Sequence, residues 1–249
     1  MKVISVVGIS GSGKTTTVES IVAQLVKRGM SVGSVKDIHF EDFVIDTPGT
    51  NTHRHRQAGA EPVTARGLHE TDILFGQRMG IYQLLNFYSQ DWVVLEGAED
   101  CNCPTIVCAE REEDIDKLIT PTTLAVAGVV SNQGLESYKG LPVFNAPKQP
   151  EKLTSFLMER VPDLLPDFSR KCCGLCGISC RELLAAIVAG EKTREDCLLE
   201  SQVELTIGGR KITIVPFVQE VLARSLTGIV STLDGYQPNQ EITIKIKPK

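Results

Sequence analysis

The chain has 249 residues, of which 42% are apolar and 23% are charged, and its formal net charge is −5. This length suits one medium and one small domain, and the apolar fraction excludes wholesale disorder. No apolar run approaches the roughly 18 residues of a membrane-spanning helix, and an acidic chain without a long basic stripe argues against nucleic acid as a partner. Because the first residues lack a small-residue cleavage site, we expect no signal peptide and a cytoplasmic protein.

The chain opens with a predicted strand, a glycine-rich turn and a predicted helix. The β-branched run 3–7 predicts a buried strand, and apolar residues at helical spacing predict a helix that ends near Gly29. Between them, Gly8-x-x-x-x-Gly13-Lys14-Thr15 is a complete P-loop signature. The backbone N–H groups of such a loop surround a phosphate, the lysine reaches the β- and γ-phosphates, and the threonine hydroxyl can ligate Mg²⁺. The predicted nucleotide-binding residues are Gly11, Ser12, Gly13, Lys14, Thr15 and Thr16.

Further elements predict a doubly wound, mostly parallel α/β sheet. Strands are expected over 32–35, 43–45, 91–96, 105–108, 124–130 and 141–144, and helices over 82–87 and 152–159. This pattern fills a predicted P-loop domain over 1–160. A segment rich in proline and aspartate predicts a linker over 161–170. Beyond it we expect a small cysteine-rich α+β domain over 171–249, with a helix from Arg181, a hairpin around Gly208-Gly209, a helix from Pro216 and a last strand over 242–246.

Two carboxylates are candidates for a role in Mg²⁺ binding or catalysis near the phosphates. Phosphoryl chemistry uses a carboxylate near Mg²⁺ and the attacking water. Glu96 ends the most hydrophobic predicted strand, and Asp46 precedes Thr-Pro-Gly49 in an arrangement like the Asp-x-x-Gly switch of GTPases. We assign the metal-side role to Glu96 and a phosphate-sensing loop to Asp46, so Lys14, Asp46 and Glu96 are the catalytic candidates. Either carboxylate could instead be a polar residue at a strand end.

The identity of the base is not decided by the pattern. Val130-Ser-Asn-Gln133 follows a late predicted strand and supplies the asparagine of the Asn-Lys-x-Asp motif of GTPases, but no aspartate follows it. The sequence pattern therefore leaves guanine and adenine open.

Together these segments resemble the MobB family of P-loop adaptor proteins in molybdopterin guanine dinucleotide biosynthesis. The resemblance spans roughly 1–160 and rests on the P-loop, Val35-Lys36-Asp-Ile-His39, Asp46-x-Pro48-Gly49 leading to Gln57-Ala-Gly-Ala60, and Val-Leu-Glu96-Gly97. It implies GTP and Mg²⁺ binding with at most weak hydrolysis, a homodimer, and Lys36 and His39 as further binding residues. The implied partners are molybdopterin, its guanylyltransferase, or a molybdenum or tungsten enzyme. The chain departs from the family at Phe40, at Asn51 and at Cys101-Asn-Cys103.

The cysteines form a second kind of motif. All eight lie beyond residue 100, and Cys173, Cys176 and Cys180 are followed after the next predicted helix by Cys197. Three thiols on one glycine-rich loop and a fourth at a distance suit a [4Fe–4S] cluster, whereas structural zinc tends to use two separate Cys-x-x-Cys pairs. The stretch also resembles the four-cysteine iron–sulfur domain of corrinoid and Rnf-type proteins, with one spacing shorter. Cys172 is a spare thiol, Cys101 and Cys103 could hold a metal or bridge a dimer, and Cys108 is expected in the core.

The favoured hypothesis is a GTP-binding accessory protein of molybdenum or tungsten cofactor maturation that carries an iron–sulfur domain. An alternative is an NTP-dependent factor that inserts metal or iron–sulfur into an anaerobic metalloenzyme. A small-molecule kinase is a third, but the sequence lacks an evident arginine-rich lid.

Overall fold

The computed structural model describes residues 1–40, 42–168, 173, 175–197, 199, 203–212, 214–238 and 240–247. The chain divides into two compact units, Met1–Val161 and Pro162–Lys249. In the described part of the chain, no helix is both long enough and apolar enough to cross a membrane.

The first unit is built on a parallel sheet of five strands in the order β2-β5-β1-β6-β7. These strands are β1 (Lys2–Gly8), β2 (Val32–Lys36), β5 (Trp92–Glu96), β6 (Thr105–Cys108) and β7 (Thr123–Ala127). Strands β5 and β7 are buried along their whole length, as expected of a sheet covered on both faces. The predicted α/β fold with a mostly parallel sheet is confirmed, and all five carboxyl ends meet at one edge.

Helices cover this sheet. Helix α1 (Lys14–Lys27) buries Ile21 and Leu25 on one face and lies against α5 (Pro150–Arg160). Arg28, at the end of α1, donates to the Ser155 hydroxyl at 2.8 Å. The remaining helices of this unit are α2 (Asn51–Gln57), α3 (Ile81–Leu85), α4 (Glu112–Leu118) and the 3-10 turn η1 (Val129–Gln133).

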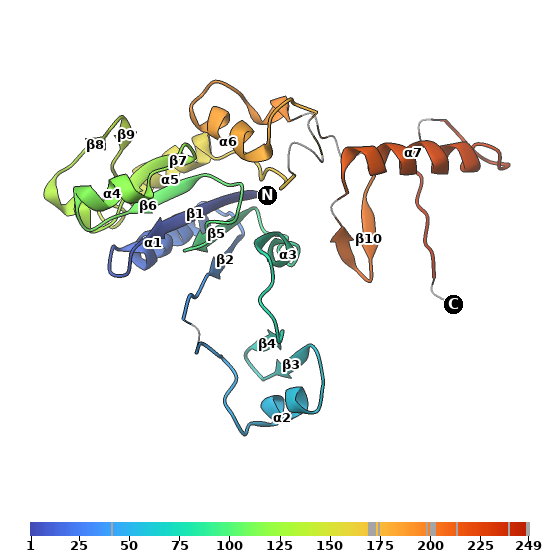
Figure 1. The fold of residues 1–249 in the computed structure, drawn as a ribbon, viewed down its shortest axis with the longest axis horizontal. Coiled ribbons are helices and arrows are strands. Elements are labelled where there is room, and N and C mark those ends of the chain that lie inside the picture. The colour runs from blue at the N-terminus through green and yellow to red at the C-terminus, as the bar shows by residue number, and fades with distance from the viewer. Residues whose placement is uncertain are drawn as a thin grey trace. The chain divides into compact units, whose positions relative to one another are not determined.

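A small lobe of the first unit is inserted in the chain between the neighbouring strands β2 and β5. It contains α2 and the antiparallel pair β3 (Val63–Arg66) and β4 (Thr71–Leu74), drawn in cyan below the sheet in Figure 1. The strand predicted over 43–45 is wrong: this stretch forms no strand, and Phe43, Val44 and Ile45 are exposed. A β-branched run forms a strand only where a sheet edge pairs with it.

The strand predicted over 141–144 is only partly formed. Strands β8 (Ser137–Tyr138) and β9 (Leu141–Pro142) make a short antiparallel pair. The next residue, Val143, forms an isolated parallel bridge to Val126 of β7. The chain therefore extends the edge of the main sheet for one residue before it turns away.

The second unit has its own small core. Leu165, Leu183 and Leu184 are buried together, and the latter two belong to α6 (Cys180–Val188). Helix α6 begins with a capping box in which Ser179 accepts from the Glu182 N–H and Glu182 accepts from the Ser179 N–H. The unit also contains η2 (Arg194–Asp196), β10 (Leu205–Ile207), β11 (Arg210–Ile212) and α7 (Pro216–Val230).

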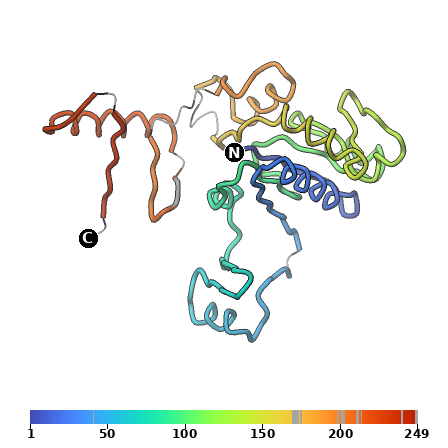
Figure 2. The backbone as a smooth tube through the Cα atoms, turned by 180° about the vertical axis from the view of Figure 1, so that it is seen from behind, coloured from blue at the N-terminus to red at the C-terminus, as the bar shows by residue number. Residues whose placement is uncertain are grey.

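Strands β10 and β11 pair antiparallel across Gly208 and Gly209, whose φ angles of 58° and 79° suit the tight hairpin that the sequence predicts. The strand predicted over 242–246 is wrong. Figure 2 shows this part of the chain as an extended segment, but residues 241–247 form no strand, and Ile246 is 90% exposed. Alternating apolar residues do not form a strand without an edge to pair with.

Candidate functional site

The P-loop connects β1 to α1 at the carboxyl edge of the sheet. Gly13 is the N-cap of α1 and has φ 93°, a left-handed conformation that glycine adopts without strain. A Cβ on Gly8 would lie 2.3 Å from the Cys108 carbonyl oxygen, so the loop approaches β6 too closely for a side chain. The Lys14 ammonium donates to the carbonyl oxygens of Gly8 at 2.8 Å and Ile9 at 2.7 Å. The lysine therefore lies folded over the loop that it follows. The Ser12 hydroxyl donates to the Ile9 oxygen within this loop, whereas Gly11, Thr15 and Thr16 are exposed.

Glu96 connects the P-loop to the neighbouring strands. One of its carboxylate oxygens accepts from the Thr15 hydroxyl at 2.9 Å and from the Lys36 ammonium at 2.8 Å. The register of the sheet explains this meeting, because Lys36 of β2 lies beside Glu96 of β5. Burial raises the pKa of Glu96, but the hydrogen bonds from Lys36 and Thr15 and the charges of Lys36 and Lys14 outweigh burial and hold the pKa below its ordinary value. Glu96 is therefore ionised at neutral pH.

His39 and Arg78 lie near a second carboxylate, that of Asp37, which follows β2. The His39 ring is 3.4 Å from the Gly97 carbonyl oxygen and 3.9 Å from the Asp37 carboxylate. Arg78, from the segment between β4 and α3, donates to the same carboxylate at 2.9 Å. Asp37 is in turn fixed by its N–H, which donates to the Glu96 carbonyl oxygen. Sequence reasoning missed Asp37, although it lies between Lys36 and His39, and it missed Arg78, which belongs to no recognisable motif.

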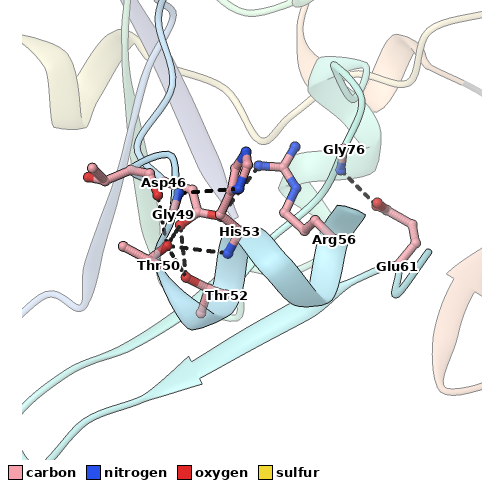
Figure 3. A network of polar contacts seen from close by, with 9 residues as sticks. Asp46, Gly49, Thr50, Thr52, His53, Arg56, Glu61 and Gly76 are labelled. Atoms are coloured by element: carbon pink, nitrogen blue, oxygen red, sulfur yellow. Dashed lines mark hydrogen bonds and ion pairs between the residues drawn. The ribbon is translucent and has the colours of Figure 1, made fainter. Parts of the chain in front are cut away.

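Asp46 lies in a network of its own, shown in Figure 3. Its carboxylate accepts from the Thr50 hydroxyl at 2.9 Å and the Thr52 hydroxyl at 2.8 Å, and Arg56 is 3.8 Å from its second oxygen. Thr50 is also the N-cap of α2 and accepts from the His53 N–H. The side-chain hydrogen bonds and the ion pair described for Asp46 are with residues 50–56, so they connect this carboxylate to the start of α2.

The cysteines of the first unit are buried. Cys101 and Cys103 are 5% and 2% exposed. Cys108 contacts the Thr17 hydroxyl in the core, and burial raises the pKa of its thiol to about 11. The prediction that Cys108 belongs to the core is confirmed.

In the second unit, Cys180 starts α6 and is buried, whereas Cys173, Cys176 and Cys197 are half-buried. Burial raises the pKa of Cys180, and the neighbouring thiols of Cys197, Cys173 and Cys176 raise it further. Across the described residues, no three His, Cys, Asp or Glu side chains gather closely enough to hold a metal ion. The geometry thus gives no support to the predicted cluster ligands or to a metal on Cys101 and Cys103. Cys172 lies outside the described residues.

Comparison with known proteins agrees with the P-loop geometry. The family described as molybdopterin guanine dinucleotide synthesis protein B, or MobB, matches residues 3–132, just over half of the chain. The chain belongs to the MobB family. The match contains the P-loop, Lys36, His39, Asp46 and Glu96.

The relatives of this chain align with different shares of its length. The "Putative molybdopterin-guanine dinucleotide biosynthesis adapter protein" of Methanocaldococcus jannaschii is 28% identical over 99% of this chain and 97% of its own length. A Bacillus subtilis relative, named as a "Probable molybdopterin-guanine dinucleotide biosynthesis adapter protein", is 26% identical over 58% of this chain and 85% of its own length. The crystal structure of Bacillus subtilis MobB is 25% identical, has a TM-score of 0.53, and covers 63% of this chain and 98% of its own. About a third of this chain thus has no counterpart in that structure, although nearly all of it has one in the archaeal relative.

Proposed function

We propose that this chain is a GTP-binding adapter of molybdopterin guanine dinucleotide biosynthesis. The observation that most directly supports this proposal is at Glu96, whose ionised carboxylate accepts hydrogen bonds from the P-loop residue Thr15 and from Lys36. A P-loop with a carboxylate at this position binds the phosphates of a nucleotide with Mg²⁺. Membership in the MobB family and the names of its relatives support the adapter role. The adapter would act on molybdopterin together with a guanylyltransferase or a molybdenum or tungsten enzyme, and as a homodimer.

The residues present fit Mg²⁺. This ion prefers hard oxygen ligands and is usually held by one or two protein groups together with substrate phosphates. The Thr15 hydroxyl and the Glu96 carboxylate, 2.9 Å apart, are such a pair, and they would hold the ion. Bound there, Mg²⁺ would neutralise charge on the phosphates. Lys14 binds the phosphates, and Lys36 keeps Glu96 ionised.

Titration calorimetry with GTP, in the presence and absence of Mg²⁺, tests this proposal. Wild type should bind GTP more tightly with Mg²⁺, and Lys14→Ala should lose binding while keeping its unfolding temperature. Glu96→Gln should retain Mg²⁺-free binding and lose most of the gain that Mg²⁺ provides. A wild-type chain that binds no GTP, or a Lys14→Ala chain that binds it normally, would contradict the proposal.

We also propose that the second unit carries a [4Fe–4S] cluster on Cys173, Cys176, Cys180 and Cys197. What supports this is the spacing of the four thiols in the sequence, three on one glycine-rich loop and a fourth after the next helix. A chain that binds such a cluster could also act in the alternative role, as an NTP-dependent factor that inserts metal or iron–sulfur into a metalloenzyme. Anaerobic purification tests it: about four irons per chain and absorbance near ~400 nm are expected, and both should disappear in Cys180→Ser. Zinc in place of iron, or a colourless metal-free chain, would rule the cluster out.

A further inference from the structure

Two segments of chain connect the small lobe to the rest of the first unit, one leaving β2 and one leading to α3 (Figure 1). The first segment carries Asp37 and the second carries Arg78. The Arg78 guanidinium donates to the Asp37 carboxylate at 2.9 Å, so the two segments are joined at the base of the lobe. Arg78 is therefore held at the carboxyl edge of the sheet, where β2 ends.

Direct contacts connect this ion pair to the P-loop. The Asp37 N–H donates to the Glu96 carbonyl oxygen at 2.8 Å, and a Cβ on Gly97 would lie 4.0 Å from the Asp37 Cβ. The Glu96 side chain in turn accepts from the Thr15 hydroxyl of the P-loop. Ligands of open α/β sheets bind at this carboxyl edge. The contacts place Arg78 beside the residues that would hold Mg²⁺ and the phosphates.

The carboxylates of this edge are buried, and the cations that pair with them are exposed. The side chains of Glu96 and Asp37 are 9% and 19% exposed, whereas those of Lys36 and Arg78 are 58% and 69% exposed. The negative charges thus lie beneath the positive ones, and an anion that approaches meets N–H donors first. Stability alone explains little of this arrangement, because exposed ion pairs contribute at most about 1 kcal/mol.

Both cations keep N–H donors that a ligand could use. Arg78 bonds to Asp37 through one nitrogen, Nη2, although a guanidinium can bond to an anion through two. The Lys36 ammonium bonds to one oxygen of Glu96. Within the part of the chain that the structure describes, neither charged group has another hydrogen-bond partner. A phosphoryl group accepts from such donors on several oxygens, and arginine and lysine both suit it.

We infer that Arg78, together with Lys36, binds a phosphoryl dianion beside the P-loop. The inference rests on the proposed nucleotide binding and names residues that would contact one phosphoryl group at that site. Two sources have this chemistry, the terminal phosphate of the nucleotide and the phosphomonoester of a second ligand. Asp37 is a positioning residue, because it holds the guanidinium next to Glu96 and does not itself contact the anion.

Titration of the full chain with GTP and with GDP, both with Mg²⁺, tests the first source. Wild type should bind GTP more tightly than GDP. Arg78→Ala should weaken GTP binding about tenfold and leave GDP binding nearly unchanged. Arg78→Lys, which keeps the charge but loses the planar fork, should show a smaller loss. Arg66→Ala removes an exposed arginine of β3 in the same lobe, so it is the matched control and should behave as wild type.

Titration with glycerol phosphate tests the second source. The chain is first saturated with an analogue of GTP whose imido bridge resists hydrolysis and whose terminal phosphate fills its own place. If a second ligand supplies the phosphoryl group, this loaded chain should bind glycerol phosphate, and Arg78→Ala should bind it about tenfold more weakly. If the loaded chain does not bind it and Arg78→Ala loses the preference for GTP, the terminal phosphate is the source.

A double variant tests the positioning role of Asp37. Asp37→Ala should weaken the same phosphoryl binding about threefold and add nothing to the effect of Arg78→Ala, whereas a separate structural effect would add to it. If Arg78→Ala changes neither the preference for GTP over GDP nor the binding of glycerol phosphate, the inference is wrong while nucleotide binding stands. If wild type binds no nucleotide, the proposed function and the inference fail together.

Discussion

Glu96 is a buried carboxylate whose stability contribution depends on its two donors. Lys36 is 2.8 Å away but its side chain is 58% exposed, so the ion pair is partly screened by solvent. The Thr15 hydroxyl is the second donor. Replacing the carboxylate by an amide keeps the shape of the side chain and removes its charge, which makes Glu96→Gln the informative variant.

We predict that Glu96→Gln lowers the unfolding temperature at neutral pH and that this difference disappears in acid. The folded-state pKa of Glu96 lies below its ordinary value, so its stabilising effect is present above the ordinary pKa. The effect is lost as the pH falls through the lowered folded-state pKa. Thermal unfolding of wild type and Glu96→Gln between about pH 7 and about pH 3 measures this. A difference that grows as the pH falls would contradict the assignment.

Asp46 illustrates a residue whose motif and contacts lead to different expectations. Its likeness to a GTPase switch predicts a role near the phosphates, whereas its hydrogen bonds with Thr50 and Thr52 connect it to the start of α2. We predict that Asp46→Ala accelerates amide hydrogen exchange over 50–57 and changes GTP affinity less than twofold. Asp46→Asn, which keeps one acceptor oxygen, should show a smaller effect on exchange. A large loss of GTP affinity with unchanged exchange would restore the phosphate-sensing role.

Among the helices and strands, the sequence predicts those with a clear apolar periodicity or a characteristic glycine pattern. The P-loop, β1, α1 and β5 are all recovered, because each has a strong apolar period or an unambiguous turn. Helix α2 was not predicted, since Asn51–Gln57 is entirely polar and buries no residue. Helix α4 was not predicted either, because Ile115 is its one buried residue.

The candidate site was predictable only where one segment carries the motif. Lys14, Thr15 and Glu96 follow from local patterns, and Lys36 and His39 from the family resemblance. Arg78 reaches Asp37 across 41 positions of the sequence. Such a pair depends on strand order and register, which a single sequence does not reveal.

The contact between β7 and the P-loop leads to a prediction about glycine. Gly128 has φ 89°, and a Cβ there would lie 2.2 Å from the Ser12 carbonyl oxygen. Gly128→Ala should therefore lower the free energy of unfolding by more than the roughly 1–2 kcal/mol expected for an alanine in the left-handed conformation. It should also weaken GTP binding, because the new methyl group would displace the P-loop. Gly134 has φ 80° and no neighbour within 4 Å of the place where a Cβ would lie, so Gly134→Ala should lower the free energy of unfolding only by the cost of the left-handed backbone. Urea unfolding and GTP titration of both variants measure the difference, and equal costs would show that the loops do not depend on this contact.

In the whole molecule, the two units differ in how extensive their buried cores are. Strands β5 and β7 of the first unit's sheet are buried along their whole length. The described second unit has a small core of three leucines, and Gln219 is the one buried residue of its helix α7. The crystal structure of Bacillus subtilis MobB matches 63% of this chain with 98% of its own, so a chain of about the size of the first unit is sufficient for this fold.

We therefore predict that a truncated chain of residues 1–161 folds cooperatively and binds GTP within about threefold of the full chain. Its sheet, its P-loop and Glu96 all lie within Met1–Val161, and a protein of this size usually unfolds in one transition. Residues 162–249 alone should unfold at lower temperature, because a small apolar core provides little stability. Calorimetric unfolding of the truncated chain, of residues 162–249 and of the full chain, with GTP titration of the first and last, tests this. A truncated chain that aggregates, or that binds GTP far more weakly than the full chain, would show that the nucleotide site needs the second unit.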